Sequence, residues 1–143
     1  MKTLTLEAPA KINLTLDILG RRPDCYHDMR MVMQAVSLGD TVTVTETAEG
    51  FSLLAEDIAL PARRPTLEQQ AAESFFRYLG RPMPGLEVRL VKRVPAYAGL
   101  GGGSADVAAV LRCLRALYAP ELPRSALEEI GLAEIGRASC RER

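Results

Sequence analysis

The sequence has little of what several classes of protein need. Its three cysteines, Cys25, Cys113 and Cys140, form no Cys-x-x-Cys pair, so neither a disulfide framework nor a zinc site is indicated and a cytoplasmic location is expected. The 18 basic and 18 acidic residues give no net charge, which argues against a nucleic-acid partner. No apolar run approaches the roughly 18 residues of a membrane span, and no secretory leader follows Met1. We therefore expect a globular protein with neither a nucleic-acid nor a membrane partner.

The patterning that is present predicts a mixed fold. A chain of 143 residues with 48% hydrophobic residues has the size and apolar content of one ordinary domain. Alternating apolar residues predict strands early in the chain, and 3.6-residue periodicity predicts helices later. The predicted strands lie at 4–6, 11–19, 29–37, 41–45, 51–54 and 86–94, and the helices at 67–79, 107–118 and 123–130. This order is typical of an α+β domain, with a two-layer mixed sheet and helices on one face.

Glycines and polar residues predict the boundaries of these elements. Gly39-Asp40 predicts a turn between two strands, and Glu49-Gly50 predicts a hairpin that pairs 51–54 with 41–45. Thr66-Leu-Glu-Gln is a capping box, and Gly131 predicts the end of the last helix.

Side-chain type predicts which residues of these elements are buried. Phe75 and Tyr78 lie on the apolar stripe of the first helix and are expected in the core. Lys92 and Arg93 are expected as solvated charges at a strand end, with help in neutralising a nucleotide as the alternative.

One glycine-rich stretch stands between a strand pattern and a helix pattern. Residues 95–106 read Pro-Ala-Tyr-Ala-Gly-Leu-Gly-Gly-Gly-Ser-Ala-Asp, and a helical pattern follows from Val107. Glycine lets a ligand approach bare N–H groups, and the first turn of a helix has unpaired donors at the positive end of its dipole. Both features favour phosphate, although the spacing matches neither the Walker nor the dinucleotide-binding pattern. On the glycines alone, a plain structural turn stays open.

The whole string resembles the phosphate loop of the GHMP kinases, which include galactokinase, homoserine kinase and mevalonate kinase. Its triple glycine narrows the resemblance to members that act on 4-diphosphocytidyl-2-C-methyl-D-erythritol. Two positions depart from the usual pattern, because Tyr97 replaces a small residue and Ala105 replaces a second serine. The resemblance implies that Ser104 contacts Mg²⁺. It also implies that ATP is bound by Pro95, Ala96, Tyr97, Ala98, Gly99, Leu100, Gly101, Gly102, Gly103, Ser104 and Ala105.

A second motif lies near the start of the chain. Alternation from Lys11 to Leu19 predicts a strand with Lys11, Asn13, Thr15 and Asp17 on one polar face, for which simple solvation is one interpretation. The string Pro-Ala-Lys-Ile-Asn-Leu at 9–14 resembles the opening of the same kinases. That resemblance implies that Lys11 is catalytic, orienting the acceptor hydroxyl and offsetting charge, and that Asn13 binds substrate.

A third motif occupies the turn after this strand. His27 is the only histidine, and a lone histidine is commonly a surface or structural residue. In the GHMP kinases that the chain resembles, Gly-Tyr-His lies here and holds a cytosine, which implies substrate binding by Tyr26 and His27. Cys25 replaces the glycine, and a non-glycine residue is awkward if the turn needs a positive φ. Cys25 as a nucleophile is the rival interpretation, but the sequence has no second histidine to activate it.

The three motifs together imply an ATP-dependent kinase for the 2-hydroxyl of a cytidine diphosphate substrate in non-mevalonate isoprenoid biosynthesis. Another GHMP kinase, of the homoserine or mevalonate type, and a non-catalytic anion-binding module are the alternatives. Residues 1–134 are expected to form the N-terminal, ATP-binding domain. Residues 135–143 lack apolar periodicity and match a translated sequencing adapter, so a non-native tail is expected, with a disordered basic tail as the alternative. A C-terminal domain and a Gly-(Ala/Ser)-Asp-Val-Pro motif with a catalytic aspartate are expected in further residues of the native protein.

Overall fold

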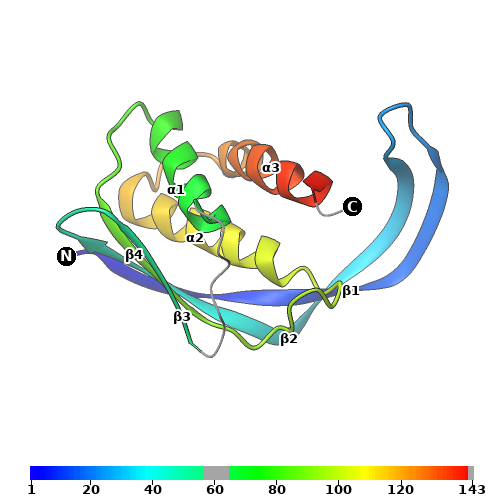
Figure 1. Cartoon of the computed structure of the whole chain (residues 1–143), viewed down its shortest axis with the longest axis horizontal. Coiled ribbons are helices and arrows are strands. Elements are labelled where there is room, and N and C mark those ends of the chain that lie inside the picture. The colour runs from blue at the N-terminus through cyan, green and yellow to red at the C-terminus, as the bar shows by residue number, and fades with distance from the viewer. Residues whose placement is uncertain (57–64, 142–143) are drawn as a thin grey trace.

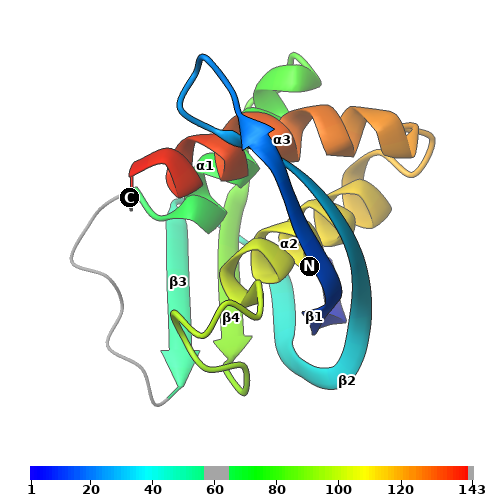
Figure 2. The same cartoon turned by 90° about the vertical axis from the view of Figure 1, so that its right-hand side faces the viewer.

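The chain folds into one mixed sheet with its helices on one face. The computed structural model describes residues 1–56 and 65–141, and from residue 135 onward the backbone alone. Its elements are β1 (Thr3–Arg21), β2 (His27–Thr47), β3 (Phe51–Glu56), α1 (Leu67–Tyr78), β4 (Gly85–Val91), α2 (Gly102–Tyr118) and α3 (Arg124–Arg141). Figure 1 shows the helices above the sheet, and Figure 2 shows the same layers after a quarter turn. The predicted two-layer α+β fold is confirmed.

The strand order corrects the predicted hairpin of 41–45 with 51–54. The order is β1-β2-β4-β3, in which β4 pairs antiparallel with β2 and parallel with β3. A glycine lets β4 enter between these two strands, because a Cβ on Gly85 would lie only 2.5 Å from the Glu49 nitrogen. The Leu86 N–H then donates to the Gly50 carbonyl at 2.8 Å. The Glu49-Gly50 turn exists, but it leads to β3 on the far side of β4.

The turn predicted at Gly39-Asp40 is wrong, because both residues lie inside the 21-residue strand β2. Gly39 pairs with Pro9, and a Cβ on Gly39 would lie 3.0 Å from the Ala8 carbonyl oxygen. The glycine therefore serves a close approach of two strands and not a reversal of the chain. Asp40 is fully buried, and the ladder shifts register between Pro9 and Lys11.

The core lies between the helix-bearing face of the sheet and α1, α2 and α3. Alternate residues of β2 and β4 face the helices and are buried; they are Val42, Val44, Leu86, Val88 and Leu90. The helices cover them with Ala71, Phe75, Val107, Val110 and Leu114. Burying one large apolar side chain contributes about 1.5–3 kcal/mol. The opposite face is polar, with threonine pairs such as Thr3–Thr45 at 2.9 Å, as expected for a sheet covered on one side.

The helices confirm most of the predicted boundaries. The Thr66 hydroxyl accepts from the Gln69 N–H at 3.3 Å, so the N-terminal cap of α1 is confirmed. Phe75 is buried as predicted, but Tyr78 is 49% exposed and the prediction that it is in the core is wrong. Phe76 is buried in its place and packs edge-to-face on Tyr118 with ring centroids 5.1 Å apart. No helix within the described ranges is long and apolar enough to cross a membrane.

The last helix does not end at Gly131. The backbone of α3 continues through it to Arg141, including part of the segment expected to be a tail, while residues 142–143 lie outside the described range. Gly131 is buried, and a Cβ there would contact Leu111 Cδ1 at 3.5 Å. This glycine therefore sits where α3 packs on α2, and it does not adopt the positive φ that would terminate a helix.

Candidate functional site

The glycine-rich loop joins the end of β4 to the start of α2. The predicted helix at 107–118 is confirmed, but α2 already starts at Gly102, so only residues 92–101 form the connection. Gly101 caps the helix in the left-handed conformation (φ 71°, ψ 22°), and within the described residues no side chain caps the first-turn N–H groups. These donors are therefore free for an anion, and the helix dipole favours one at this position.

The four glycines of the loop fall into three groups. Gly99 and Gly101 have φ values of 72° and 71°, which side-chain-bearing residues rarely adopt. Gly102 lies against the sheet, because a Cβ there would be 3.0 Å from Val94 Cγ1. Gly103 has neither constraint: its φ is ordinary, and no atom of the described residues lies within 4 Å of a Cβ position. A bare residue with open space at the first turn of a helix is what an approaching phosphate requires.

Two of the three residues that depart from the family's motifs adopt positive φ. Tyr97 has φ 58° and Cys25 has φ 70°, and they are the only non-glycine residues with positive φ in the described ranges. The awkward geometry anticipated for Cys25 is thus present, at a cost of about 1–2 kcal/mol relative to an unstrained backbone. Tyr97 is 95% exposed and packs on nothing, so it is available to a ligand at the loop.

Lys11 is joined to the loop by its backbone and its side chain. Its N–H donates to the Leu100 carbonyl at 3.0 Å, and its Nζ donates to the Gly99 carbonyl at 3.0 Å. The side chain also covers Gly101, where a Cβ would lie 3.3 Å from Lys11 Cγ and Cε. The predicted catalytic lysine and the predicted phosphate loop are therefore adjacent, although they are separated by almost 90 residues in the chain.

The register of the β1–β2 ladder corrects the predicted polar face of β1. Lys11 pairs with Ala35 and Asn13 with Met33, but Thr15 pairs with Val32, so Leu14 is an extra residue on β1. Residues that pair across the ladder lie on the same face, and every second residue of β2 lies on the same face. Lys11 and Asn13 therefore lie on one face, and Thr15 and Asp17 lie on the other. The bulge brings Leu16 and Ile18 of β1 onto the face of Lys11 and Asn13, where they lie beside Met29, Met31 and Met33 of β2.

Residues 11–35, the outer parts of β1 and β2 with the turn between them, form the distal hairpin, and Tyr26 and His27 lie at its tip. The turn is closed by the Arg22 N–H on the Tyr26 carbonyl at 2.6 Å, and the Arg22 guanidinium pairs with Asp24 at 3.3 Å. His27 pairs with Arg21 in the ladder and shares the face of Met29 and Lys11. Figures 1 and 2 both show the distal hairpin curving toward the side of the sheet that carries the helices. The structure thus places His27 and Lys11 on the same face. Along β2, however, His27 is eight residues from Ala35, the residue that pairs with Lys11.

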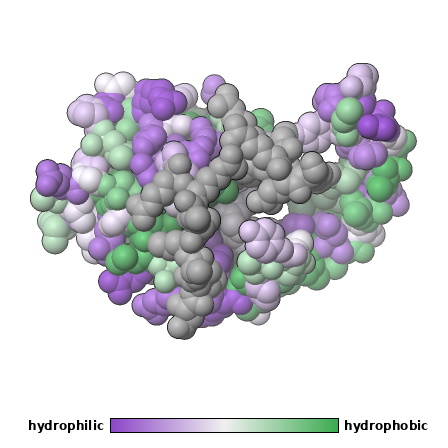
Figure 3. Space-filling view, viewed as in Figure 1, coloured by the Kyte–Doolittle hydropathy of each residue, from purple (hydrophilic) through white to green (hydrophobic). Residues whose placement is uncertain are grey.

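Apolar side chains are exposed along this distal hairpin. Figure 3 shows hydrophobic residues over its length, with hydrophilic residues at the tip. The exposed set comprises Ile12, Leu14, Leu16, Ile18, Leu19, Met29, Val32 and Met33. An apolar surface of this extent lowers the expected solubility of the 143-residue chain.

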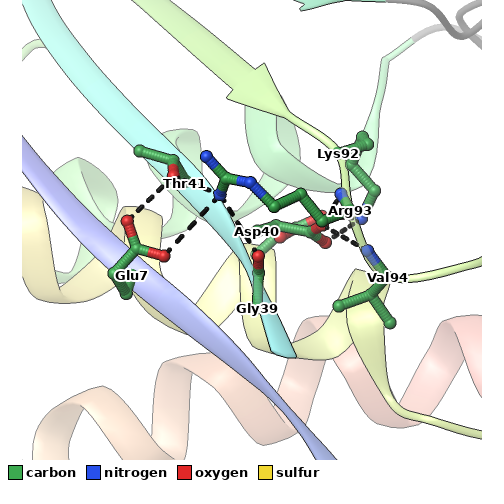
Figure 4. A network of polar contacts seen from close by, with 8 residues as sticks. Glu7, Gly39, Asp40, Thr41, Lys92, Arg93 and Val94 are labelled. Atoms are coloured by element: carbon green, nitrogen blue, oxygen red, sulfur yellow. Dashed lines mark hydrogen bonds and ion pairs between the residues drawn. The ribbon is translucent and has the colours of Figure 1, made fainter. Parts of the chain in front are cut away.

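A buried charge cluster beneath the loop was missed by the sequence interpretation. Lys92, expected to be solvated, is 13% exposed and its Nζ lies between Asp40 Oδ2 and Asp106 Oδ2, the latter at 2.5 Å. Figure 4 shows Asp40 also accepting from the N–H groups of Arg93 and Val94, at 2.5 and 2.8 Å. Arg93, in contrast, extends its guanidinium to the Thr41 hydroxyl at 2.7 Å in an exposed hydrogen bond. The sequence offered only two indications of this cluster, namely Asp40 in the predicted turn and Asp106 in the glycine-rich motif.

The cluster perturbs the pKa of each member. Burial raises the pKa of Asp106 to about 7, although Lys92 partly opposes that rise. Burial also acts to raise the pKa of Asp40, but the Lys92 ammonium and two backbone N–H groups more than offset it and leave the pKa lowered. The pKa of Lys92 is raised, because its two carboxylate partners outweigh the effect of burial. Lys92 is therefore charged near neutral pH, and Asp40 is ionised.

Comparison with known proteins identifies the family of the chain. The family model described as "GHMP kinases N terminal domain" matches residues 66–141, more than half of the chain, and the chain belongs to the GHMP kinase family. Solved homoserine and mevalonate kinases share the fold, with TM-scores of 0.70 at 18% identity. The family uses ATP as its phosphate donor.

Several similar proteins within the family share one named activity. The chain is 41% identical over 133 residues to 4-diphosphocytidyl-2-C-methyl-D-erythritol kinase of Geobacter sulfurreducens, covering 92% of this chain and 47% of that protein. It is 47% identical to the enzyme of the same name from Carboxydothermus hydrogenoformans, covering 87% of this chain and 42% of that one. A crystal structure of 4-(cytidine 5'-diphospho)-2C-methyl-D-erythritol kinase superposes with a TM-score of 0.73 at 37% identity, over 90% of this chain and 46% of that chain. The chain thus spans about half the length of the relatives it matches.

Proposed function

We propose that the full-length protein transfers the γ-phosphoryl group of ATP to the 2-hydroxyl of 4-diphosphocytidyl-2-C-methyl-D-erythritol. The observation that supports this most is the direct contact between Lys11 and the glycine loop, by the two hydrogen bonds of 3.0 Å. Such a contact brings a group suited to an acceptor hydroxyl beside donors suited to a polyphosphate. The names of relatives with 41 and 47% identity support the choice of acceptor.

The chemistry requires alignment and charge neutralisation. The acceptor oxygen forms a bond to the γ-phosphorus, the bond to the β-phosphate bridging oxygen breaks, and ADP leaves. N–H groups at the start of α2 bind the phosphate oxygens, and the ammonium of Lys11 stabilises the charge that develops between acceptor and donor. In this proposal Lys11 exchanges its bond to the Gly99 carbonyl for one to the substrate.

The loop also fits Mg²⁺ that is carried mainly by the nucleotide. Mg²⁺ commonly keeps several waters and binds through substrate phosphates with one or two protein ligands. No group of three acidic, histidine or cysteine residues suited to a metal occurs in the described part of the chain. The exposed Ser104 hydroxyl, in the first turn of α2, is a single oxygen ligand beside the phosphate site. Bound Mg²⁺ would neutralise phosphate charge, and Ser104 would supply the protein contact.

The separation of the two ends of the hairpin favours a long substrate. His27 and Ala35, the ladder partner of Lys11, are eight residues apart on β2. An extended strand of this length spans about 26 Å, and the curvature of the hairpin shortens the direct path. A cytidine joined through a diphosphate to an alcohol can contact both ends, with the base at Tyr26 and His27 and the hydroxyl at Lys11 and Asn13. Homoserine and mevalonate are too short to do so.

The proton of the acceptor hydroxyl needs a base that we expect in the remainder of the full-length protein. Asp17 lies on the face opposite to Lys11, and Asp24 and Asp28 lie beside Arg22 at the distal turn. None of these three aspartates is placed to accept the proton near Lys11. The 143-residue chain is therefore predicted to bind ATP without turnover, and product formed at more than a trace rate would contradict this.

The test is turnover by the full-length protein obtained from the continuous gene past Glu134. ADP release is measured with 4-diphosphocytidyl-2-C-methyl-D-erythritol, homoserine and mevalonate as acceptors. The proposal predicts turnover with the cytidine substrate, and a Lys11→Met variant that binds ATP but loses at least about a hundredfold in kcat. Preference for either short alcohol would assign another GHMP kinase activity, and ATP binding without turnover on any acceptor would favour an anion-binding module. The same gene sequence shows whether residues 135–143 are native.

A further inference from the structure

The second turn of α2 is joined to the sheet by a buried ion pair. Asp106, in the second turn of the helix, is 2% exposed and gives Oδ2 to Lys92 Nζ at 2.5 Å. Its other oxygen, Oδ1, is buried and has no hydrogen-bond partner in the described part of the chain. Lys92 is thus the one cation in the described part of the chain that pairs with this carboxyl group, and losing it would leave Asp106 buried without an ionic partner.

The other side of the cluster does not depend on Lys92 in this way. Asp40 of β2 receives the N–H groups of Arg93 and Val94 on Oδ1 in addition to the ammonium on Oδ2. The end of β4 would therefore stay attached to β2 without Lys92. Only the ionic attachment of α2 through Asp106 would be lost. Loss of Lys92 should therefore loosen the start of α2 and leave the pairing of β2 with β4 in place.

Lys92 is also close to the phosphate loop itself. A Cβ on Gly102, the first residue of α2, would lie 3.6 Å from Lys92 Nζ and 3.0 Å from Val94 Cγ1. The ammonium therefore lies directly beneath the residue at which the free N–H donors begin. A small displacement of α2 would move those donors relative to Lys11, which is fixed to the loop at Gly99 and Leu100.

We propose that Lys92 is a positioning residue of the phosphate site, which ties α2 to β2 by bridging Asp106 and Asp40 and so fixes the helical N–H donors against the nucleotide. This inference rests on the proposed function for the identity of the ligand. Lys92 makes no contact with the reacting groups in this role. Its contribution is the preorganisation of donors, which affects binding of phosphate more than global stability.

The first experiment needs no ligand. Amide hydrogen exchange is measured on the free 143-residue chain for Lys92→Met and for Arg93→Met as a matched control, because Arg93 is the neighbouring cation and its guanidinium faces Thr41 and Glu7. We expect exchange at residues 105–109, whose amides donate to the first carbonyls of α2, to rise at least about tenfold in Lys92→Met, with little change in β2 and β4, and no such rise in Arg93→Met. Unchanged exchange at 105–109, or a uniform rise over the whole chain, would overturn the proposal.

The second experiment separates positioning from folding. Lys92→Arg keeps a cation that can bridge two carboxylates, and the triple variant Asp40→Asn, Lys92→Met, Asp106→Leu removes every buried charge of the cluster. Affinity for Mg·ATP and for inorganic triphosphate is measured with thermal unfolding. We expect the triple variant to unfold near the wild-type temperature yet bind both ligands at least about tenfold more weakly, and Lys92→Arg to retain most of the affinity.

The outcomes distinguish the two proposals. Wild-type affinity in a folded triple variant would overturn the role of Lys92 while leaving the phosphate site intact. If the wild-type chain binds neither Mg·ATP nor triphosphate, the proposed phosphate site fails, and the exchange experiment still decides whether Lys92 holds the start of α2.

Discussion

Gly103→Ala separates a structural glycine from a ligand-binding one. Gly103 is exposed, has an ordinary φ and has nothing within 4 Å of its Cβ position, so the methyl group meets no protein atom. Replacing glycine by alanine inside a helix stabilises it by up to about 1 kcal/mol, and less in the first turn. The folded chain should therefore be as stable as the wild type or slightly more stable.

Nucleotide binding should change in the opposite direction. The new methyl is attached beside the Gly103 N–H and restricts an oxygen that approaches this donor. A hydrogen bond to a charged group contributes about 1.5–3 kcal/mol, so its loss weakens ATP binding by roughly ten- to a hundredfold. Gly102→Ala would be less informative, because its Cβ would lie 3.0 Å from Val94 Cγ1 and disturb packing.

The assay is calorimetric titration of the 143-residue chain with Mg·ATP, together with thermal unfolding. Gly131→Ala is the matched control: it is also a helical glycine, its Cβ would make an ordinary 3.5 Å contact with Leu111, and it lies in α3, away from the loop. The control should gain stability and bind ATP normally. Unchanged ATP affinity in folded Gly103→Ala would refute the assignment of the first turn of α2 as the phosphate site.

Three further predictions concern the distal turn and the buried cluster. In the full-length protein, replacing Tyr26 and His27 together by alanine should raise KM for the cytidine substrate at least about tenfold, because the base loses its stacking and hydrogen-bonding partners. KM for ATP should change little. Equal effects on both KM values would indicate a collapsed turn. Cys25→Gly should raise the free energy of unfolding by up to about 1 kcal/mol, because glycine adopts a φ of 70° without strain, whereas Cys25→Ser should not. Denaturant titration measures both variants, and equal stabilities would argue against strain at this position. Because burial raises the pKa of Asp106 to about 7, the folded chain favours the protonated carboxyl, and the free energy of unfolding should fall as pH rises from about 4 to about 7. Asp106→Asn should reduce this dependence of the unfolding free energy on pH. The same dependence in wild type and variant would contradict a raised pKa of Asp106.

The sequence predicted those parts of the fold and site that depend on local pattern. Alternation located the core residues of β2 and β4, and the capping box located the start of α1 at Thr66. The glycine string identified the loop, since its conformation depends on residues that tolerate positive φ. These features are set by residues close together in the chain.

The errors arose where distant segments decide the outcome. Gly39 reads as a turn, but the approach of Ala8, about 30 residues away, makes it part of a long strand. The polar face predicted for β1 failed because one bulge at Leu14 reverses the faces beyond it, which alternation alone does not reveal. The prediction that Lys92 is solvated is wrong because both of its carboxylate partners come from other elements.

The length of the connection between β4 and α2 is fixed at both of its ends. Val94 is anchored by its N–H on Asp40, and Leu100 is anchored by its carbonyl on the Lys11 N–H. An added or deleted residue between these anchors would shift the loop donors relative to Lys11 unless the change is absorbed elsewhere. Tyr97, which is 95% exposed, lies midway and is the place where an extra residue could bulge into solvent. Homologous sequences that vary in loop length should therefore carry their insertions around Tyr97, and deletions in this connection should be rarer than substitutions at the same positions.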